Sequence, residues 1–174
     1  DTSIHLTRSI DKIIIVPLLD FTSVGLYQFN LQILLGFEML PIALHNYLLS
    51  EESSNQKHKK IEFFALLLSI IVIIIVIFLS PIIIPLLFSE YSDGILGLQI
   101  MILSLLPLTL GSIFSAKLQA NNSKNSGTAV IVKVISFVIL LFMLGQFYGI
   151  IGLSIAILTS YVIYALYLGI LLKK

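Results

Sequence analysis

Charged side chains near the N-terminus recur at spacings that would place them on one side of a helix. With successive residues about 100° apart, Asp1, His5, Arg8, Asp11 and Lys12 fall within an arc of about 120°. Arg and Lys bind anionic groups through charge-assisted hydrogen bonds, and Arg can do so with two parallel bonds. One neighbouring carboxylate cannot neutralise two cations and a histidine. The stripe therefore predicts an anion-binding surface, with pairing of Asp11 to Arg8 and Lys12 as the alternative.

A second polar stripe follows in the next segment of the chain. Its members share an arc of about 140° opposite a face of Leu, Ile and Phe, and they are Gln28, Gln32, Glu38, His45 and Asn46. Two interpretations of Glu38 stay open. In the first, Glu38 forms a salt bridge with a cation of the first stripe. In the second, Glu38 is a protonatable carboxylate that couples transport to an ion.

The hydropathy of the chain predicts the helices that carry these stripes. Between Phe63 and Phe88 there is no charged residue, and most positions are Ile, Leu, Val or Phe. A helix of this length reaches roughly 39 Å, enough to cross a hydrocarbon core of about 30 Å with some tilt. A soluble core helix would keep a polar face for water. The stretch therefore predicts a transmembrane helix.

Composition favours the same class. Hydrophobic residues make up 58% of the 174 residues and charged residues 11%, against about 25% charged in ordinary soluble domains, and mean hydropathy is +1.08. A net charge of +1 without clustered Lys and Arg predicts no nucleic-acid partner. The absence of cysteine excludes disulfides and thiolate metal sites. Because the chain opens with Asp1 and no signal-peptide pattern, we expect a piece of a longer protein.

Short polar breaks divide the chain into a partial helix and five full spans. Each break contains Gly, Asn, Ser or Asp, as turns require. We predict an all-α bundle of about six transmembrane helices, one of them incomplete, forming a single domain over residues 1–174. The predicted helices cover 1–20, 24–49, 61–88, 94–118, 126–147 and 150–172. Pro81, Pro85 and Pro107 are expected to kink or locally unwind their spans.

The distribution of basic residues predicts the orientation. Lys57, Lys59, Lys60, Lys117, Lys124, Lys173 and Lys174 all lie in the second gap, the fourth gap or the C-terminus, whereas the other gaps hold only Asp20, Glu90 and Asp93. Loops rich in Lys and Arg stay on the cytoplasmic side of a membrane. We therefore expect a multi-pass protein of the cytoplasmic membrane, with loops 51–60 and 117–126 and the C-terminus in the cytoplasm.

This topology places several ionisable groups at membrane depth. Asp11 would lie roughly 13 Å below the outer end of its helix, where a charge costs about 2.5–3.5 kcal/mol on insertion scales. Such side chains must line a water-filled cavity or pair with a neighbour. Lys133 is a weaker candidate for the same site, because its long stem could instead carry the ammonium to the cytoplasmic surface. Gln28 and Gln32 complete the candidate cavity, and Glu38 is the candidate for ion coupling.

Other chemistry has no signature in the sequence. His5, His45 and His58 lack the mutual spacing of a metal site. No nucleophile elbow, P-loop or dinucleotide fingerprint is present. We therefore expect no catalytic residues, no metal and no cofactor.

Several motifs, in order, resemble the C-terminal half of polysaccharide and oligosaccharide-lipid flippases in the multidrug/oligosaccharidyl-lipid/polysaccharide exporter superfamily. An acidic-basic-apolar run at Asp11–Ile15 leads into a Val-Gly-x-Tyr segment at Val24–Tyr27. Pro85–Phe88 and Tyr148–Ala156 are similar to later landmarks of the family. The resemblance covers nearly the whole chain.

The resemblance implies a fold and a function. Members of this family have twelve to fourteen helices in two lobes, and this chain would supply helices seven to twelve of the C-terminal lobe. Family helices seven and eight line a central cavity for the pyrophosphate and sugars of a lipid-linked saccharide, and they correspond to the two polar stripes found here. The implied partners are that substrate, membrane lipids and a missing N-terminal lobe of the same protein.

Three function classes compete. A flippase needs basic cavity residues, which Arg8 and Lys12 provide. A multidrug/cation antiporter of the same superfamily would favour carboxylates such as Glu38. A non-transporting membrane scaffold would need no charges at membrane depth, so the charges argue against it. Either transporter would work by alternating access, rocking two lobes about a site at the midplane.

Cysteine substitutions at Ser54, Ser92 and Ser123 test the orientation. With a membrane-impermeant thiol reagent applied to intact cells, we expect labelling at position 92 and protection at positions 54 and 123. The chain has no native cysteine, so the background is clean. The reverse labelling pattern would overturn the orientation.

Overall fold

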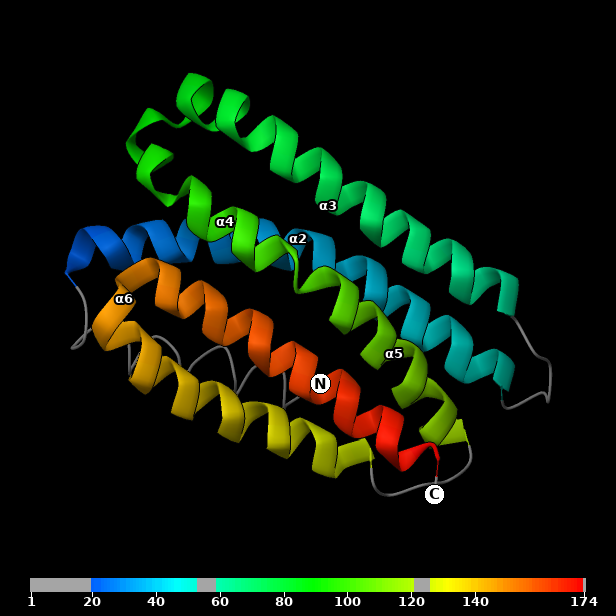
Figure 1. Ribbon diagram of the computed structural model, residues 1–174. Helices are drawn as coiled ribbons and strands as arrows, with labels where there is room; N and C mark the ends of the chain where they lie inside the picture. Colours follow the sequence, from blue (N-terminus) through cyan, green and yellow to red (C-terminus); the bar gives the residue numbers. More distant parts are fainter. Residues whose placement is uncertain (1–19, 53–58, 121–125, 174) are drawn as a thin grey trace.

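The computed structural model describes residues 20–52, 59–120 and 126–173, and every regular element among them is helical (Figure 1). The all-α class is therefore confirmed for these residues. The predicted helix 1–20 lies outside the described residues except for Asp20. The elements are α2 (Phe21–Glu52), α3 (Lys59–Leu87), the 3-10 helix η1 (Ser89–Gly94), α4 (Ile95–Ile102), α5 (Leu105–Ala120) and α6 (Ser126–Leu171).

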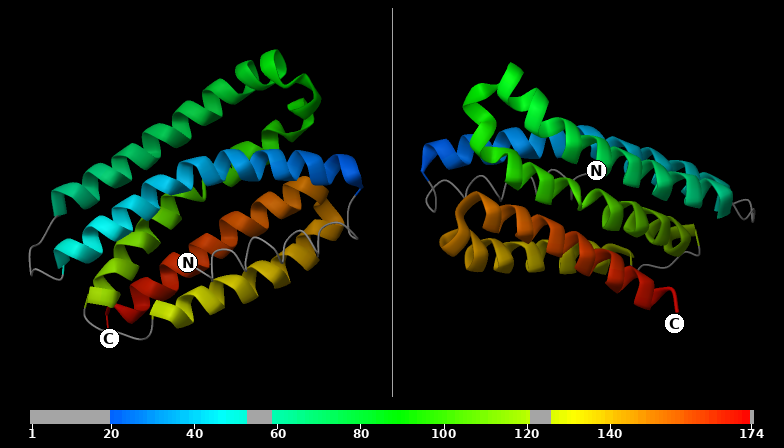
Figure 2. Two further views of the ribbon diagram at one scale, coloured as in Figure 1. Left: turned by 180° about the vertical axis from the view of Figure 1, so that it is seen from behind. Right: turned by 45° about the horizontal axis from the view of Figure 1, so that its top comes forward.

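Four stretches are long and apolar enough to cross a membrane: Phe21–Ser50, Lys59–Leu87, Ser89–Ala120 and Gly127–Leu171. Their length and composition are those of a membrane protein. The last stretch is a hairpin, because Gly149 has φ 53° and ψ −131° in the middle of α6. The two arms of α6 lie side by side and antiparallel (Figures 1 and 2). The described residues thus form five apolar arms, close to the five full spans that hydropathy predicts.

The start of α2 differs from the prediction. We expect a turn at residues 20–23, but the helix already begins at Phe21. Asp20 is its N-cap, since the backbone N–H of Ser23 donates to Asp20 Oδ2 at 3.2 Å and the Ser23 hydroxyl donates to Oδ1 at 2.6 Å. These two bonds favour the charged carboxylate and lower the pKa of Asp20. The turn-forming residues of this break therefore cap the helix.

The predicted span 94–118 is interrupted. The 3-10 helix η1 precedes this span. The span itself is divided into α4 and α5 by a break at Leu103 and Ser104. Pro107 explains the break, because it has no N–H for the carbonyl of Leu103 and its ring would clash with that carbonyl in a continuous helix. The Ser104 hydroxyl donates to the Met101 carbonyl at 2.6 Å and stabilises the broken turn. Local unwinding near Pro107 is thus confirmed.

At Pro81 and Pro85 the helix does not unwind, and α3 continues to Leu87. Pro81 leaves the Ile77 carbonyl without its usual donor four residues ahead. The side-chain amide of Gln99, on α4, donates to this carbonyl at 3.1 Å. A neighbouring helix therefore supplies the missing bond, as membrane helices require.

The main core lies where α2, α3, α4, α5 and both arms of α6 meet. Its fully buried side chains include Tyr27, Leu34, Leu98, Met101, Ile102, Leu105, Leu141 and Leu153. Helix α3 packs on one edge of this group against η1, α4 and α5, and α6 lies on the opposite edge (Figures 1 and 2). Most large side chains of α3 are exposed, which suits a helix surrounded by lipid on most of its surface.

The basic residues of the described helix ends lie at one end of the bundle. The end of α2, the start of α3, the end of α5 and both outer ends of α6 lie at one end of the bundle (Figure 1). Lys59 and Lys60 begin α3 there, and Lys117 lies in the last turn of α5. The start of α2, η1 and the Gly149 bend lie at the opposite end, with Asp20, Glu90 and Asp93. We refer to these as the basic end and the acidic end.

Close approach of the two arms of α6 depends on Gly152. A Cβ atom at this position would collide with the carbonyl oxygen of Leu144 in the other arm. Small residues permit such contacts between membrane helices, and Ala156 and Ser160, four and eight residues further, are also buried. Gly152 therefore provides the contact at which the two arms pack most closely against one another.

Replacement of Gly152 by Ala should destabilise the hairpin by about 1–3 kcal/mol, the usual cost of overpacking. Thermal unfolding of the purified protein in detergent measures the effect. Gly127→Ala is the matched control, because Gly127 lies on the same helix with no atom within 4 Å of an added Cβ. Equal melting temperatures for the two variants would contradict the close approach.

Candidate functional site

A carboxylate is buried within the bundle. Glu38 lies in the middle of α2, and its side chain is only 6% exposed. The hydroxyl of Tyr161, on the second arm of α6, donates to Glu38 Oε1 at 2.5 Å. The two residues are 123 positions apart in the sequence. This hydrogen bond therefore ties the first described helix to the last one.

Lys133 completes the group from the first arm of α6. Its Nζ lies 4.8 Å from the centre of the Tyr161 ring and 5.6 Å from that of Tyr164. Both distances are within the range of a cation–π interaction. The ammonium therefore lies against rings of the opposing arm, an arrangement that differs from extension to the membrane surface. We call Glu38, Lys133 and Tyr161 the Glu38 cluster.

Tyr161 bridges the two opposite charges of the cluster. Its O–H is directed at the carboxylate and its ring lies beneath the ammonium. In a low-dielectric interior such contacts are strong, and an unpaired charge is costly. A change in protonation or in a bound ion at Glu38 would weaken the link between α2 and the α6 hairpin. The cluster thus has the chemistry of a charge-sensitive junction.

The second polar stripe divides between two sides of α2. Glu38 and His45 turn toward the bundle, and His45 Nδ1 lies 3.2 Å from the Ser112 carbonyl oxygen of α5. Gln28 is half-buried and Gln32 is exposed. The packed side of α2 repeats at helical spacing through Tyr27, Asn30, Leu34, Glu38 and Leu48, which are all buried. The stripe therefore spans the boundary between the packed side and the exposed side of α2.

His5, Arg8, Asp11 and Lys12 lie outside the described residues. Their predicted role as an anion-binding stripe stays a prediction, as does a salt bridge between Glu38 and either cation of that stripe. Among the described residues, no group of three His, Asp or Glu side chains could hold a metal ion.

Sequence reasoning missed Asn30 and Tyr161. Asn30 is fully buried, and its Nδ2 donates to the Gly94 carbonyl at 2.8 Å. A Cβ at Gly97 would lie 3.1 Å from that Nδ2 and 3.1 Å from Ser154 Oγ, so α2, α4 and α6 meet tightly here. An Asn within an apolar span is itself a signal of an interhelical hydrogen bond. Tyr161 gives a similar signal, as a phenol in the middle of an apolar arm.

Comparison with known protein-family models, curated proteins and solved structures finds no match for this chain. Arguments about function therefore rest on the cluster and on the polar groups of α2.

Replacement of Tyr161 by Phe tests the central link. The ring and its contact with Lys133 remain, and the hydrogen bond to Glu38 is lost. Because a hydrogen bond to a charged group contributes about 1.5–3 kcal/mol, we expect a lower free energy of unfolding and a lower melting temperature in detergent.

Tyr148→Phe provides the control, since Tyr148 lies on the same helix and is 63% exposed. This variant should melt like the parent protein. A Tyr161→Phe protein as stable as Tyr148→Phe would contradict the proposed strength of the link.

Proposed function

We propose that this chain is the C-terminal lobe of a flippase that moves a lipid-linked oligosaccharide or polysaccharide precursor across the cytoplasmic membrane by alternating access. The observation that carries the transporter class is the Glu38 cluster. Ionisable groups inside membrane bundles are expensive and are typical of substrate or ion pathways. A scaffold held only by apolar packing would gain nothing from a carboxylate and an ammonium at this position.

The exposed side of α2 supports a cavity next to the cluster. Gln32 is exposed eleven residues after Phe21, roughly 16 Å along the helix, where a lipid contact would leave its amide without hydrogen bonds. A water-filled cavity against this side satisfies Gln28 and Gln32, and both amides can bind sugar hydroxyl groups. The N-terminal lobe of the same protein would form the opposite wall.

The proposed substrate, a lipid-linked saccharide, rests on the resemblance to the flippase family and on the two cations Arg8 and Lys12. Arg8 and Lys12 suit a pyrophosphate, because Arg forms bidentate bonds with phosphate oxygens and Lys adds a point charge. The orientation follows from the basic end, where the loops 51–60 and 117–126 and the C-terminus would face the cytoplasm.

A multidrug/cation antiporter of the same superfamily is the second candidate. It is favoured by one observation, the buried carboxylate of Glu38 held by the Tyr161 hydroxyl. In that case Glu38 would exchange protons or sodium ions, and an organic cation would occupy the cavity.

Substitution of Arg8 and Lys12 distinguishes the two candidates. In cells that depend on the full-length protein for glycan export, Arg8→Ala and Lys12→Ala should each abolish export while membrane expression is kept. Arg8→Lys should fail as well, because a point charge cannot copy a bidentate fork. Lys173→Ala, which removes a cation at the basic end, is the control and should export normally.

Full export by the double Ala variant would overturn the proposed anion site. Cation-driven efflux of an organic cation that is lost in Glu38→Gln but kept in that double variant would establish the antiporter instead.

A further inference from the structure

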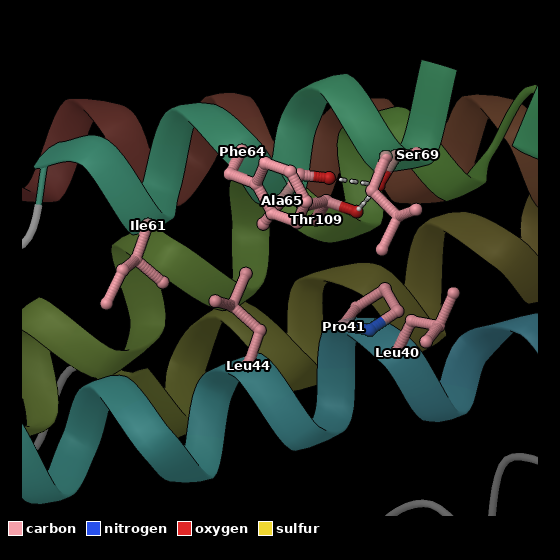
Figure 3. Close-up of a pocket in the computed structure, with 9 residues that line it drawn as sticks. Leu40, Pro41, Leu44, Ile61, Phe64, Ala65, Ser69 and Thr109 are labelled. Carbon is pink, nitrogen blue, oxygen red and sulfur yellow. Dashed lines mark hydrogen bonds between the residues drawn. The ribbon is translucent and has the colours of Figure 1, made fainter. Parts of the chain in front are cut away.

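A pocket of about 160 Å³ lies between α2, α3 and α5 (Figure 3). Side chains from α2 and α3 point toward one another across it, and Thr109 of α5 borders it. The lining is almost entirely apolar and consists of Leu40, Pro41, Leu44, Ile61, Phe64, Ala65, Leu68, Ser69 and Thr109.

The two hydroxyl groups of the pocket are already engaged within the protein. Ser69 Oγ donates to the Ala65 carbonyl at 3.0 Å, Thr109 Oγ1 donates to the Leu105 carbonyl at 2.8 Å, and the two oxygens are 2.7 Å apart. An apolar cavity of about 150 Å³ stays dry and accepts a benzene-sized guest. The chemistry and size of this pocket therefore suit a segment of hydrocarbon chain.

The pocket begins near the membrane surface and runs inward. Ile61 is the third residue of α3, and Ser69 lies eight residues deeper, a rise of roughly 12 Å. Leu40 and Phe64 are 41% and 65% exposed, so the pocket opens sideways between α2 and α3. Its mouth therefore faces the surrounding lipid, and its long direction follows that of an acyl chain.

Two lysines lie near the end of the pocket that is closest to the membrane surface. Lys59 and Lys60 are exposed in the first turn of α3, and Lys60 lies one helical turn from Phe64 on the same side. Lys117 is engaged elsewhere, because its Nζ is 2.7 Å from Glu62 Oε1. Among the described residues at the start of α3, Lys59 and Lys60 thus place their ammonium groups at the level of lipid headgroups, where basic residues attract anionic lipids.

We propose that the pocket between α2 and α3 binds one acyl chain of an anionic phospholipid, with the headgroup phosphate held by Lys59 and Lys60. The site requires only membrane insertion, so it stands independently of any transport function.

Fluorescence quenching by lipids with brominated acyl chains tests the site. The chain contains no tryptophan, so Phe64→Trp introduces a single probe at the mouth. Phe63→Trp is a matched control, because Phe63 is 68% exposed but does not line the pocket. Both variants are reconstituted into phosphatidylcholine vesicles that contain a small fraction of brominated phosphatidylglycerol or brominated phosphatidylcholine.

We expect stronger quenching at position 64 than at position 63, with a preference for phosphatidylglycerol at position 64 only. Each interfacial Lys should contribute roughly fivefold to this preference. Lys59→Gln with Lys60→Gln should remove the preference. Ala65→Phe, which fills the pocket, should reduce the quenching of the Phe64→Trp variant to the level of Phe63→Trp.

Equal quenching at the two positions would overturn the acyl-chain site, and this comparison needs no pocket-filling variant. Strong quenching at position 64 without a preference for phosphatidylglycerol would overturn the headgroup assignment.

Discussion

In a hydrocarbon environment no water is present to satisfy a polar group, and the described structure depends on this constraint. Most buried side-chain polar atoms bond to another helix or to their own backbone. Asn30 donates to Gly94, Gln99 to Ile77 and Tyr161 to Glu38. Each of these three bonds joins separate helices. The polar groups that the lipid cannot accommodate therefore also specify which helices are neighbours.

Close packing provides the remaining specificity, because lipid tails are as apolar as the helix surfaces and burial alone favours no particular partner. The contact between α5 and α6 illustrates this point. A Cβ at Gly111 would lie 2.6 Å from the Tyr164 ring, so the ring rests directly on the backbone of α5. Ser112, Ser115 and Ala116 continue this small buried surface. Small residues here allow the bulky aromatic side chains of α6 to approach.

The Glu38 cluster is a structural link, and the proposed transporter would also use it in its function. The cluster joins α2 to the α6 hairpin. The hydrogen bond from Tyr161 to Glu38 involves an ionisable group, whereas the hydrogen bonds donated by the side-chain amides of Asn30 and Gln99 do not. A transporter needs a contact of this kind, because a rocking motion between states must alter interactions whose strength an ion or substrate can change. The phospholipid pocket lies on the other side of α2, between α2 and α3. A phospholipid bound in this pocket and the Glu38 cluster would therefore both contact α2.

The sequence by itself determined the all-α class, the five apolar arms and the separation of basic from acidic ends. These properties are local, since they depend on the length of apolar runs and on charges in short breaks. The segment 1–19, which carries Arg8 and Lys12, lies outside the described residues, so that half of the candidate site stays a prediction.

Only the tertiary structure decided which side of α2 is packed, that Glu38 meets Tyr161 and Lys133, and that Gln99 compensates for Pro81. Helical periodicity groups residues of one helix, but it cannot choose between faces that both carry polar residues. That choice depends on partners 64 to 123 positions away in the chain, because in the membrane each polar group is stable only beside the group that satisfies it.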